Sequence, residues 1–219
     1  CFEYLRDVFG VLATAANCEA FFELGRAGFY PVGGGRLVIS IRGVGSGENL
    51  EPMAFMRRGR LRYVEGLSAV GGGLPDRIAE RQAMQALGRL AAAGYEVTIE
   101  QTAYEADSPG TVLFLRAVFD SACGGAFALG RRGYRAEDLA DDAADELSAY
   151  LDSAGAVDAR AADQLLTLAA LCPDRSDLLA QRRTGHLTTN AAVIEQLTGR
   201  PVDAEDTPEG AAHVKISPV

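Results

Sequence analysis

Lysine is almost absent from this sequence of 219 residues, and its scarcity excludes common kinds of nucleotide chemistry. The only lysine, Lys215, stands almost at the C-terminal end. The sequence therefore contains neither a Walker-type G-x-x-x-x-G-K-[ST] loop nor a lysine nucleophile flanked by Asp-Gly. If the chain handles a nucleotide covalently, a residue other than lysine must form the bond.

Cysteine pairs and long apolar runs are also missing. The four cysteines are far apart and form no C-x-x-C pair, so the sequence indicates neither a zinc site nor a redox motif. No apolar run approaches the roughly 20 residues needed to cross a bilayer. The start of the sequence is amphipathic and lacks the basic-then-apolar order of a secretory signal. We therefore expect a cytoplasmic protein with no membrane partner.

The chain has no excess of positive charge, because its formal net charge is −9. This balance argues against a protein that coats nucleic acid non-specifically, since that mode needs a basic surface to neutralise many phosphates. A pocket that grips one terminal phosphate needs only a few local arginines. Adjacent arginines occur at three places: Arg57-Arg58, Arg131-Arg132 and Arg182-Arg183.

Hydrophobic residues make up 48% of the chain, which is enough to bury a core in one or two domains. Apolar residues at helical spacing predict a helix over residues 2–16. Strands are expected over residues 19–24 and 36–41, and the second has the alternation typical of a half-buried strand. The glycine-rich run 28–35 between them fits no regular element, because three consecutive glycines allow a tight turn and a close backbone approach.

A flexible glycine joint at residues 43–47 precedes a predicted α/β unit. Its expected elements are a strand, a helix, three strands and an acidic helix: residues 61–69, 75–93, 95–102, 111–119, 125–129 and 135–151. We therefore divide the chain into an inserted domain, residues 46–153, and a core formed by residues 1–45 and 154–219.

Residues 154–219 are predicted to alternate further between helix and strand. Asp158 is a natural N-cap for a helix that extends to about residue 171. A strand over residues 177–182 leads into a second helix that ends near Gly199, and a strand over residues 212–216 closes the chain.

His186 is the candidate nucleophile, in the segment Gly185-His186-Leu187-Thr188-Thr189-Asn190. It stands between a predicted strand and a predicted helix start, where free N–H groups and the helix dipole attract anions. A histidine there can attack the α-phosphate of ATP and hold AMP as a phosphoramidate, and the hydroxyls of Thr188 and Thr189 could bind the same phosphate. Taken alone, a histidine at a helix start is more often a cap or a satisfied polar residue.

Asp163 and Gln164 interrupt an otherwise apolar helix. A carboxylate and an amide cost free energy when they are buried without partners, so these side chains should be exposed or bind something. The pattern alone does not separate a solvated face from a binding site. The other histidine, His213, is expected to be buried in the closing strand, which leaves His186 as the better nucleophile.

Three segments, in this order, resemble the RNA 3′-terminal phosphate cyclase family. The run 28–35, Gly-Phe-Tyr-Pro-Val-Gly-Gly-Gly, is similar to the family signature, although Ala27 stands where that signature has Arg or His. The segment Ala162-Asp163-Gln164-Leu165 looks like the nucleotide-binding helix of the family, and residues 185–190 resemble the segment that carries its adenylylated histidine. The middle region resembles the insert domain of the family, so the resemblance covers essentially the whole chain.

The resemblance implies an α/β fold, with a core layer of repeated β-α-β units similar to that of EPSP synthase and a smaller inserted α/β domain. It implies a ligase of RNA processing that uses ATP and a divalent metal, magnesium or manganese. AMP passes to His186 and then to an RNA 3′-phosphate, and the adjacent 2′-hydroxyl displaces AMP to leave a 2′,3′-cyclic phosphate. The nucleotide pocket would be lined by Arg160, Ala161, Ala162, Asp163 and Gln164.

Two departures from the family bear on activity. Arg160 stands where some members place an aromatic ring against adenine, and arginine can also stack. The family also has a front section, before the point where Cys1 stands, with a glycine-rich segment and acidic and arginine residues of the active site. We therefore expect this chain to be a fragment or one part of a split protein, and to turn over little RNA 3′-phosphate alone.

Two other classes of function are weighed against this one. A non-catalytic cyclase-like protein of ribosome biogenesis would keep the fold, but that branch lacks the histidine, so His186 argues against it. An unrelated enzyme of the enolpyruvyl-transferase kind would need several lysines, and the chain has one. We further expect the inserted domain to lie far from the nucleotide site, and the triple-glycine turn to share a core layer with His186 and Asp163.

Overall fold

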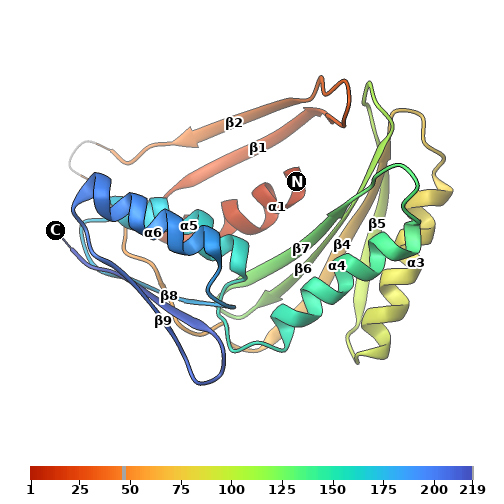
Figure 1. The fold of residues 1–219 in the computed structure, drawn as a ribbon. Helices are drawn as coiled ribbons and strands as arrows, with labels where there is room; N and C mark the ends of the chain where they lie inside the picture. Colours follow the sequence, from red (N-terminus) through yellow and green to blue (C-terminus); the bar gives the residue numbers. More distant parts are fainter. Residues whose placement is uncertain (46–47, 219) are drawn as a thin grey trace.

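The structure, a computed structural model, describes residues 1–45 and 48–218 (Figure 1). Their strands form a two-stranded sheet and two four-stranded sheets, with helices packed against the larger two. This mixed arrangement is the predicted α/β fold class. None of the helices in the described part of the chain combines the length and the apolar character that a membrane span requires. The predicted glycine joint includes Ser46 and Gly47, which lie outside the described residues, and the division of the chain at residue 46 stays a prediction.

The chain begins with a helix and an antiparallel hairpin. The helix runs through four consecutive segments, α1 (Phe2–Tyr4), η1 (Leu5–Phe9), α2 (Gly10–Ala13) and η2 (Thr14–Ala16). It ends at Asn17, whose left-handed conformation is one that asparagine tolerates better than most residues. Strands β1 (Glu19–Arg26) and β2 (Arg36–Arg42) then pair with each other.

The expected half-burial of the second strand is wrong. Every residue of β2 is exposed, and Ile41 keeps 66% of its surface accessible. Among the described residues β2 pairs only with β1, and the N-terminal helix packs against β1. Alternation therefore identified the strand but not its surroundings.

A mixed sheet with two helices on one face forms the middle of the chain, and we call it the middle sheet. Its order is β5-β4-β6-β7, in which β4 and β5 are parallel and the other pairs antiparallel. Helices α3 and α4 lie side by side on one face (Figure 1). The bounds are β4 (Leu61–Gly71), α3 (Arg77–Ala92), β5 (Val97–Tyr104), β6 (Gly110–Phe119), β7 (Cys123–Leu129) and α4 (Ala136–Leu151).

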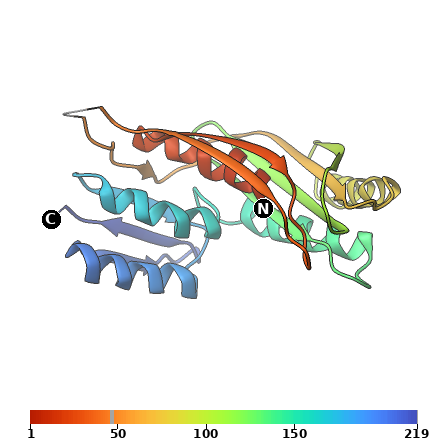
Figure 2. The ribbon, with the colours of Figure 1, turned by 90° about the horizontal axis from the view of Figure 1, so that it is seen from above.

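The other four-stranded sheet, the C-terminal sheet, has the order β3-β8-β10-β9. Strand β3 is parallel to β8, and β10 is antiparallel to both of its neighbours. Figure 2 shows the N-terminal helix, α5 and α6 in a row, and α5 packs against both of the others. The bounds are β3 (Ala54–Phe55), α5 (Ala159–Leu171), β8 (Ser176–Ala180), α6 (Gly185–Thr198), β9 (Val202–Asp206) and β10 (Ala212–Ile216).

Asp158 ties these parts together. As predicted, it caps α5, because its Oδ1 accepts the backbone N–H groups of Arg160 and Ala161 at 2.9 and 3.0 Å. It also accepts the Tyr4 hydroxyl at 2.7 Å and the Gly125 N–H at 3.0 Å. Complete burial raises the pKa of this carboxyl, and the hydrogen bonds that it accepts oppose the rise. One carboxylate thus joins the N-terminal helix, the middle sheet and α5.

The glycine-rich run forms the tip of the β1–β2 hairpin, and its glycines have separate roles. Gly33 and Gly34 have φ values of +73° and +70°, which a side chain would strain. Gly28 and Gly35 touch through their backbones, since a Cβ on Gly28 would lie 2.8 Å from the Gly35 nitrogen. The glycines of residues 28–35 are therefore required by the backbone of one tight loop.

This loop docks on the middle sheet and not on the helices that carry the candidate site. The Val32 N–H donates to the hydroxyl of buried Ser108 at 3.1 Å, and the Ala27 N–H donates to the Glu105 carbonyl at 3.0 Å. The expectation that the triple-glycine turn shares a layer with His186 is therefore wrong. The turn fastens the hairpin to the segment that connects β5 to β6.

We expect Gly110→Ala to lower the free energy of unfolding by about 1–3 kcal/mol, the usual cost of overpacking a filled site. The Phe29 ring packs directly on Gly110, and an added Cβ would overlap that ring. Gly88→Ala is the matched control, because Gly88 lies inside α3 with open space around its Cα, and alanine should stabilise that helix by about 0.5–1 kcal/mol. Urea unfolding measures both variants, and equal effects would contradict the docking described.

Candidate functional site

Helix α6 begins at a capped turn that leaves two backbone N–H groups free. The Thr184 hydroxyl accepts the Leu187 N–H at 3.0 Å, which makes Thr184 the N-cap. Among the described residues no acceptor is found for the N–H groups of Gly185 and His186. With the helix dipole, these two donors make the start of α6 attractive to an anion.

His186 is the second residue of α6, and its side chain is exposed. The imidazole is therefore accessible beside the two free N–H groups. The hydroxyl of Thr188 is engaged within the helix, because it donates to the Thr184 carbonyl at 3.0 Å. Thr189 is exposed and remains available to a ligand.

Helix α5 presents a polar face beside α6. Arg160, Asp163, Gln164 and Thr167 follow the i, i+3, i+4, i+7 spacing of one helix face, and all four keep some exposed surface. Ala161 and Ala162, which the sequence analysis also assigned to the nucleotide pocket, are fully buried in the core. Their side chains offer no surface to a ligand, and their assignment stays a prediction.

A hydrogen bond between α5 and α6 brings Asp163 to the face that carries His186. The Asn190 amide donates to Asp163 Oδ1, and Asn190 follows His186 by one helical turn. The histidine, the amide and the carboxylate therefore share one surface where the two helices meet. The sequence motif includes Asn190 but gives it no role, and its hydrogen bond between α5 and α6 is a finding of the structure.

Gln164 lies next to this carboxylate and is incompletely satisfied. Its Oε1 is buried and has no hydrogen-bond partner among the described residues. A buried amide oxygen without a partner costs free energy, which makes it a good acceptor for an approaching donor.

Arg160 connects the site to the middle sheet. Its guanidinium lies 4.6 Å from the centre of the Phe127 ring in β7 and forms a 2.5 Å ion pair with Glu146 in α4. Two residues of the expected inserted domain therefore contact Arg160 at the start of α5, and the expected distance of that domain from the His186 helix stays a prediction. No local pattern in the sequence marks Phe127 or Glu146 as neighbours of Arg160.

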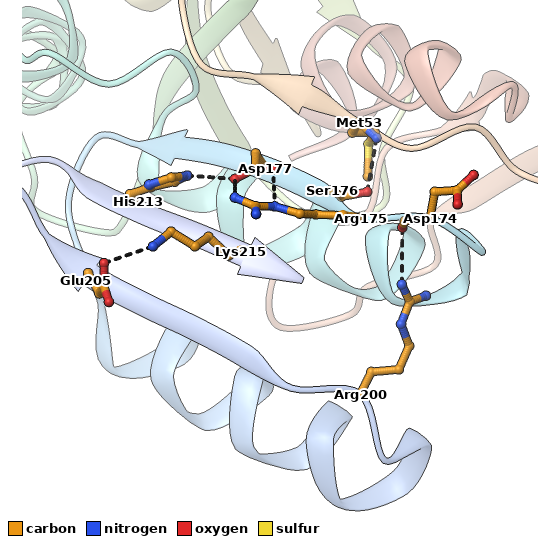
Figure 3. A network of polar contacts seen from close by, with 9 residues as sticks. All are labelled: Met53, Asp174, Arg175, Ser176, Asp177, Arg200, Glu205, His213 and Lys215. Carbon is orange, nitrogen blue, oxygen red and sulfur yellow. Dashed lines mark hydrogen bonds and ion pairs between the residues drawn. The ribbon is translucent and has the colours of Figure 1, made fainter. Parts of the chain in front are cut away.

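His213 is engaged on the other face of the C-terminal sheet (Figure 3). Ala212, Val214 and Ile216 of β10 point into the core with α5, so His213 alternates to the opposite face. It is half-buried rather than buried, and its Nε2 lies 2.8 Å from Asp177 Oδ1. The pKa of Asp177 is lowered, chiefly by its hydrogen bonds from Arg175 and also by His213.

The fold and the site together define an α/β protein with an exposed histidine at an anion-attracting helix start. Comparison with known proteins agrees with this class. The family model for the RNA 3′-terminal phosphate cyclase (RTC) insert domain matches residues 56–152, which include the middle sheet and both of its helices.

Curated relatives extend the match to nearly the whole chain. An RNA 3′-terminal phosphate cyclase of Methylococcus capsulatus is 38% identical over 217 residues, which are 98% of this chain and 59% of that protein. Proteins of the same name from Trichormus variabilis and Pyrobaculum neutrophilum are each 34% identical, over 88% and 89% of this chain and 54% and 55% of their own lengths. The chain is therefore similar to RNA 3′-terminal phosphate cyclases over nearly its whole length, in agreement with the resemblance of the three motifs. It spans a little over half the length of these relatives.

Proposed function

We propose that this chain carries the nucleotidyl-transfer centre of an ATP-dependent conversion of RNA 3′-phosphate ends into 2′,3′-cyclic phosphates. One observation carries the proposal. Exposed His186 stands at a helix start with two free N–H groups, and Asn190 holds the Asp163 carboxylate on the same face. The names of the relatives give the substrate class.

In the first step a ring nitrogen of His186 attacks the α-phosphorus of ATP. A P–N bond forms, the bond to the bridging oxygen breaks, and diphosphate leaves. The free N–H groups at Gly185 and His186 are oriented to bind oxygens of the phosphate under attack. The chain needs no lysine for this step, which suits a sequence whose single lysine, Lys215, pairs with Glu205.

In the second step an oxygen of the RNA 3′-phosphate attacks the phosphorus held by His186. The P–N bond breaks, and AMP becomes joined to the RNA end through a diphosphate link. The neighbouring 2′-hydroxyl then attacks the RNA phosphorus, loses its proton and releases AMP, which leaves the cyclic phosphate. Two transfers replace one difficult displacement.

A divalent cation would meet a single carboxylate at this face. The described residues contain no group of three or more His, Cys, Asp and Glu side chains arranged to hold a metal. Mg²⁺ is commonly held by one or two carboxylates together with substrate phosphates, and Asp163 fits that pattern. The cation would neutralise phosphate charge, while Asp163 would position it and Arg160 would bind the nucleotide.

A discharge experiment tests the proposed function. The protein is incubated with α-labelled ATP and Mg²⁺, freed of ATP, and mixed with RNA that ends in either a 3′-phosphate or a 3′-hydroxyl. We expect the label to pass to the 3′-phosphate RNA alone, because only that end carries the attacking phosphate oxygen. Transfer to both ends, or no labelled protein, would contradict the proposal. The chain spans a little over half the length of these relatives. We therefore expect it to be labelled with AMP and to pass the AMP to RNA, but to complete few rounds of cyclisation.

Replacing Asp163 with alanine should weaken AMP labelling about tenfold or more without abolishing it, because a charged contact worth about 1.5–3 kcal/mol is lost while the nucleophile remains. The measurement is the labelling rate at several ATP and Mg²⁺ concentrations. Thr167→Ala is the matched control, since Thr167 lies one turn further along the same face of α5. An equal effect of both variants, or none from Asp163→Ala, would remove Asp163 from the site.

A further inference from the structure

A hollow lies away from His186, between the hairpin loop and the middle sheet. It is a cavity of about 1120 Å³, above the range of about 300–1,000 Å³ that holds drug-sized ligands. Its walls come from the N-terminal helix, the glycine-rich loop, the start of α3 and the connection from β7 to α4. No residue of α5 or α6 is among its lining residues, so it is a different place from the candidate nucleotide site.

The inner walls of the cavity are apolar, and an aromatic ring stands free on its lining. Leu24, Ile78 and Leu139 line it, together with Phe29, whose ring packs on Gly110. Tyr30, which also lines the cavity, keeps 92% of its surface exposed. A flat apolar group can therefore enter and stack on an available ring.

The connection from β7 to α4 adds positive charge. Arg131 and Arg132 line the cavity and are exposed, and neither forms an ion pair with another described residue. Arg131 lies 4.2 Å from the centre of the Tyr134 ring. In α4, which follows, the carboxylate of Glu137 is paired with Arg81 at 2.8 Å, and that of Asp142 accepts the Tyr134 hydroxyl at 2.6 Å. In a chain of net charge −9, these two free guanidinium groups make the entrance locally attractive to a phosphate.

A buried amide on the cavity lining has an unused donor. Gln82 is completely buried, and its Oε1 accepts the hydroxyl of Ser68 at 2.9 Å. This Oε1 also lies 3.0 Å from the Thr111 hydroxyl, which donates its proton to the Ala69 carbonyl at 2.6 Å. The Nε2 of Gln82 is buried without a partner among the described residues. Glu3 also lines the cavity, and its carboxylate accepts the Tyr104 hydroxyl at 2.5 Å. The unused donor on the lining is Nε2 of Gln82, and it suits a ligand that carries acceptor atoms on a flat ring.

We infer that this cavity holds an unpaired base of the RNA, with a phosphate of the same strand on Arg131 and Arg132. A nucleobase combines the features that the walls require: two apolar faces for stacking, and edge oxygens or ring nitrogens for a donor. The adjacent phosphate matches the two arginines. A free mononucleotide has the same chemistry, but the proposed function, on which this inference rests, supplies RNA as its source. The chain thus holds the strand at one place and modifies its end at another.

The test is the binding of a fluorescent single-stranded oligoribonucleotide with a 3′-phosphate to the full chain, followed by anisotropy over a range of salt concentrations. Arg131→Gln with Arg132→Gln should weaken binding at least about tenfold and reduce the salt slope by about 1.4, since each phosphate contact on a single strand contributes about 0.7. Arg57→Gln is the control, because Arg57 is exposed and lies outside the cavity lining. It should change the affinity less than about twofold.

A photoreactive thiouridine in the same RNA should crosslink to the peptides that contain Tyr30 or Tyr134. The inference would be overturned if the chain did not bind the RNA, or if the double variant bound it with unchanged affinity. An equal loss of affinity in Arg57→Gln, or crosslinks only to other peptides, would overturn it as well. Photoreactive ATP that labels these peptides in place of RNA would make the cavity a mononucleotide site and would also overturn it. AMP labelling is measured on the same samples. Labelling without RNA binding defeats the cavity alone, whereas absence of labelling in the unsubstituted chain defeats the proposed function.

Discussion

Replacing His186 with alanine is expected to reduce AMP labelling of the protein to background. Alanine leaves the start of α6 intact, because the cap comes from Thr184 and the buried contact of the first turn comes from Leu187. The variant therefore loses the nucleophile and keeps the two N–H groups that attract phosphate. Without an attacking nitrogen no phosphoramidate forms, and removal of a nucleophile lowers such transfers by many orders of magnitude. Labelling with α-labelled ATP, followed by acid and alkali treatment, measures the result.

The second histidine supplies the control. His213→Ala removes the other imidazole of the chain, on the face of the C-terminal sheet opposite α5, where it contacts Asp177. We expect this variant to be labelled like the unsubstituted chain. Equal loss in both variants would indicate a general effect on folding, and full labelling of His186→Ala would assign the nucleotide to a different residue.

Asp158→Ala is expected to destabilise the protein by at least about 3 kcal/mol. The change removes an N-cap, worth about 1–2 kcal/mol, and leaves the Tyr4 hydroxyl and the Gly125 N–H without acceptors, at about 1–3 kcal/mol each. Asp177→Ala, which breaks a partly exposed ion pair with Arg175, should cost about 1 kcal/mol or less. Urea unfolding at constant pH compares the two. Similar losses would show that Asp158 does not connect the three parts.

The pH dependence of Asp158→Asn gives a second measure of the same carboxyl. Burial raises its pKa in the folded state above the ordinary 3.8, so the folded protein takes up the proton more readily than the unfolded chain. This carboxyl therefore makes the protein lose stability as pH rises from about 3.8 through the raised pKa. The difference in unfolding free energy between the unsubstituted chain and Asp158→Asn should change in that window. A constant difference there would contradict the raised pKa.

The sequence predicted those elements well whose own residues carry a clear cap or a regular apolar pattern. Helix α5 has a capping aspartate and a regular apolar face, and β10 alternates cleanly between core and surface, so both bounds were close to those found. Strand β9 was missed because Val-Asp-Ala-Glu-Asp carries three acidic residues and little strand propensity. It is a strand because β10 pairs with it along its whole length.

The candidate site was predictable in its residues but not in its connections. The sequence singled out His186 and Asp163, and the structure joins their helices through Asn190. Phe127 and Glu146 could not be found this way, because contacts across 33 and 14 residues depend on how the middle sheet packs against α5. The same reason explains β2, where alternation indicated a strand but could not say what lies against it.

The most direct test of the central claim is to locate the AMP on the protein. The chain is incubated with ATP and Mg²⁺, digested at alkaline pH to preserve a P–N bond, and examined by tandem mass spectrometry. We expect the adenylyl group on the peptide that contains Gly185-His186-Leu187, with fragments that assign it to His186. An adenylyl group on any other residue, or none on that peptide while the protein is labelled, would contradict the account.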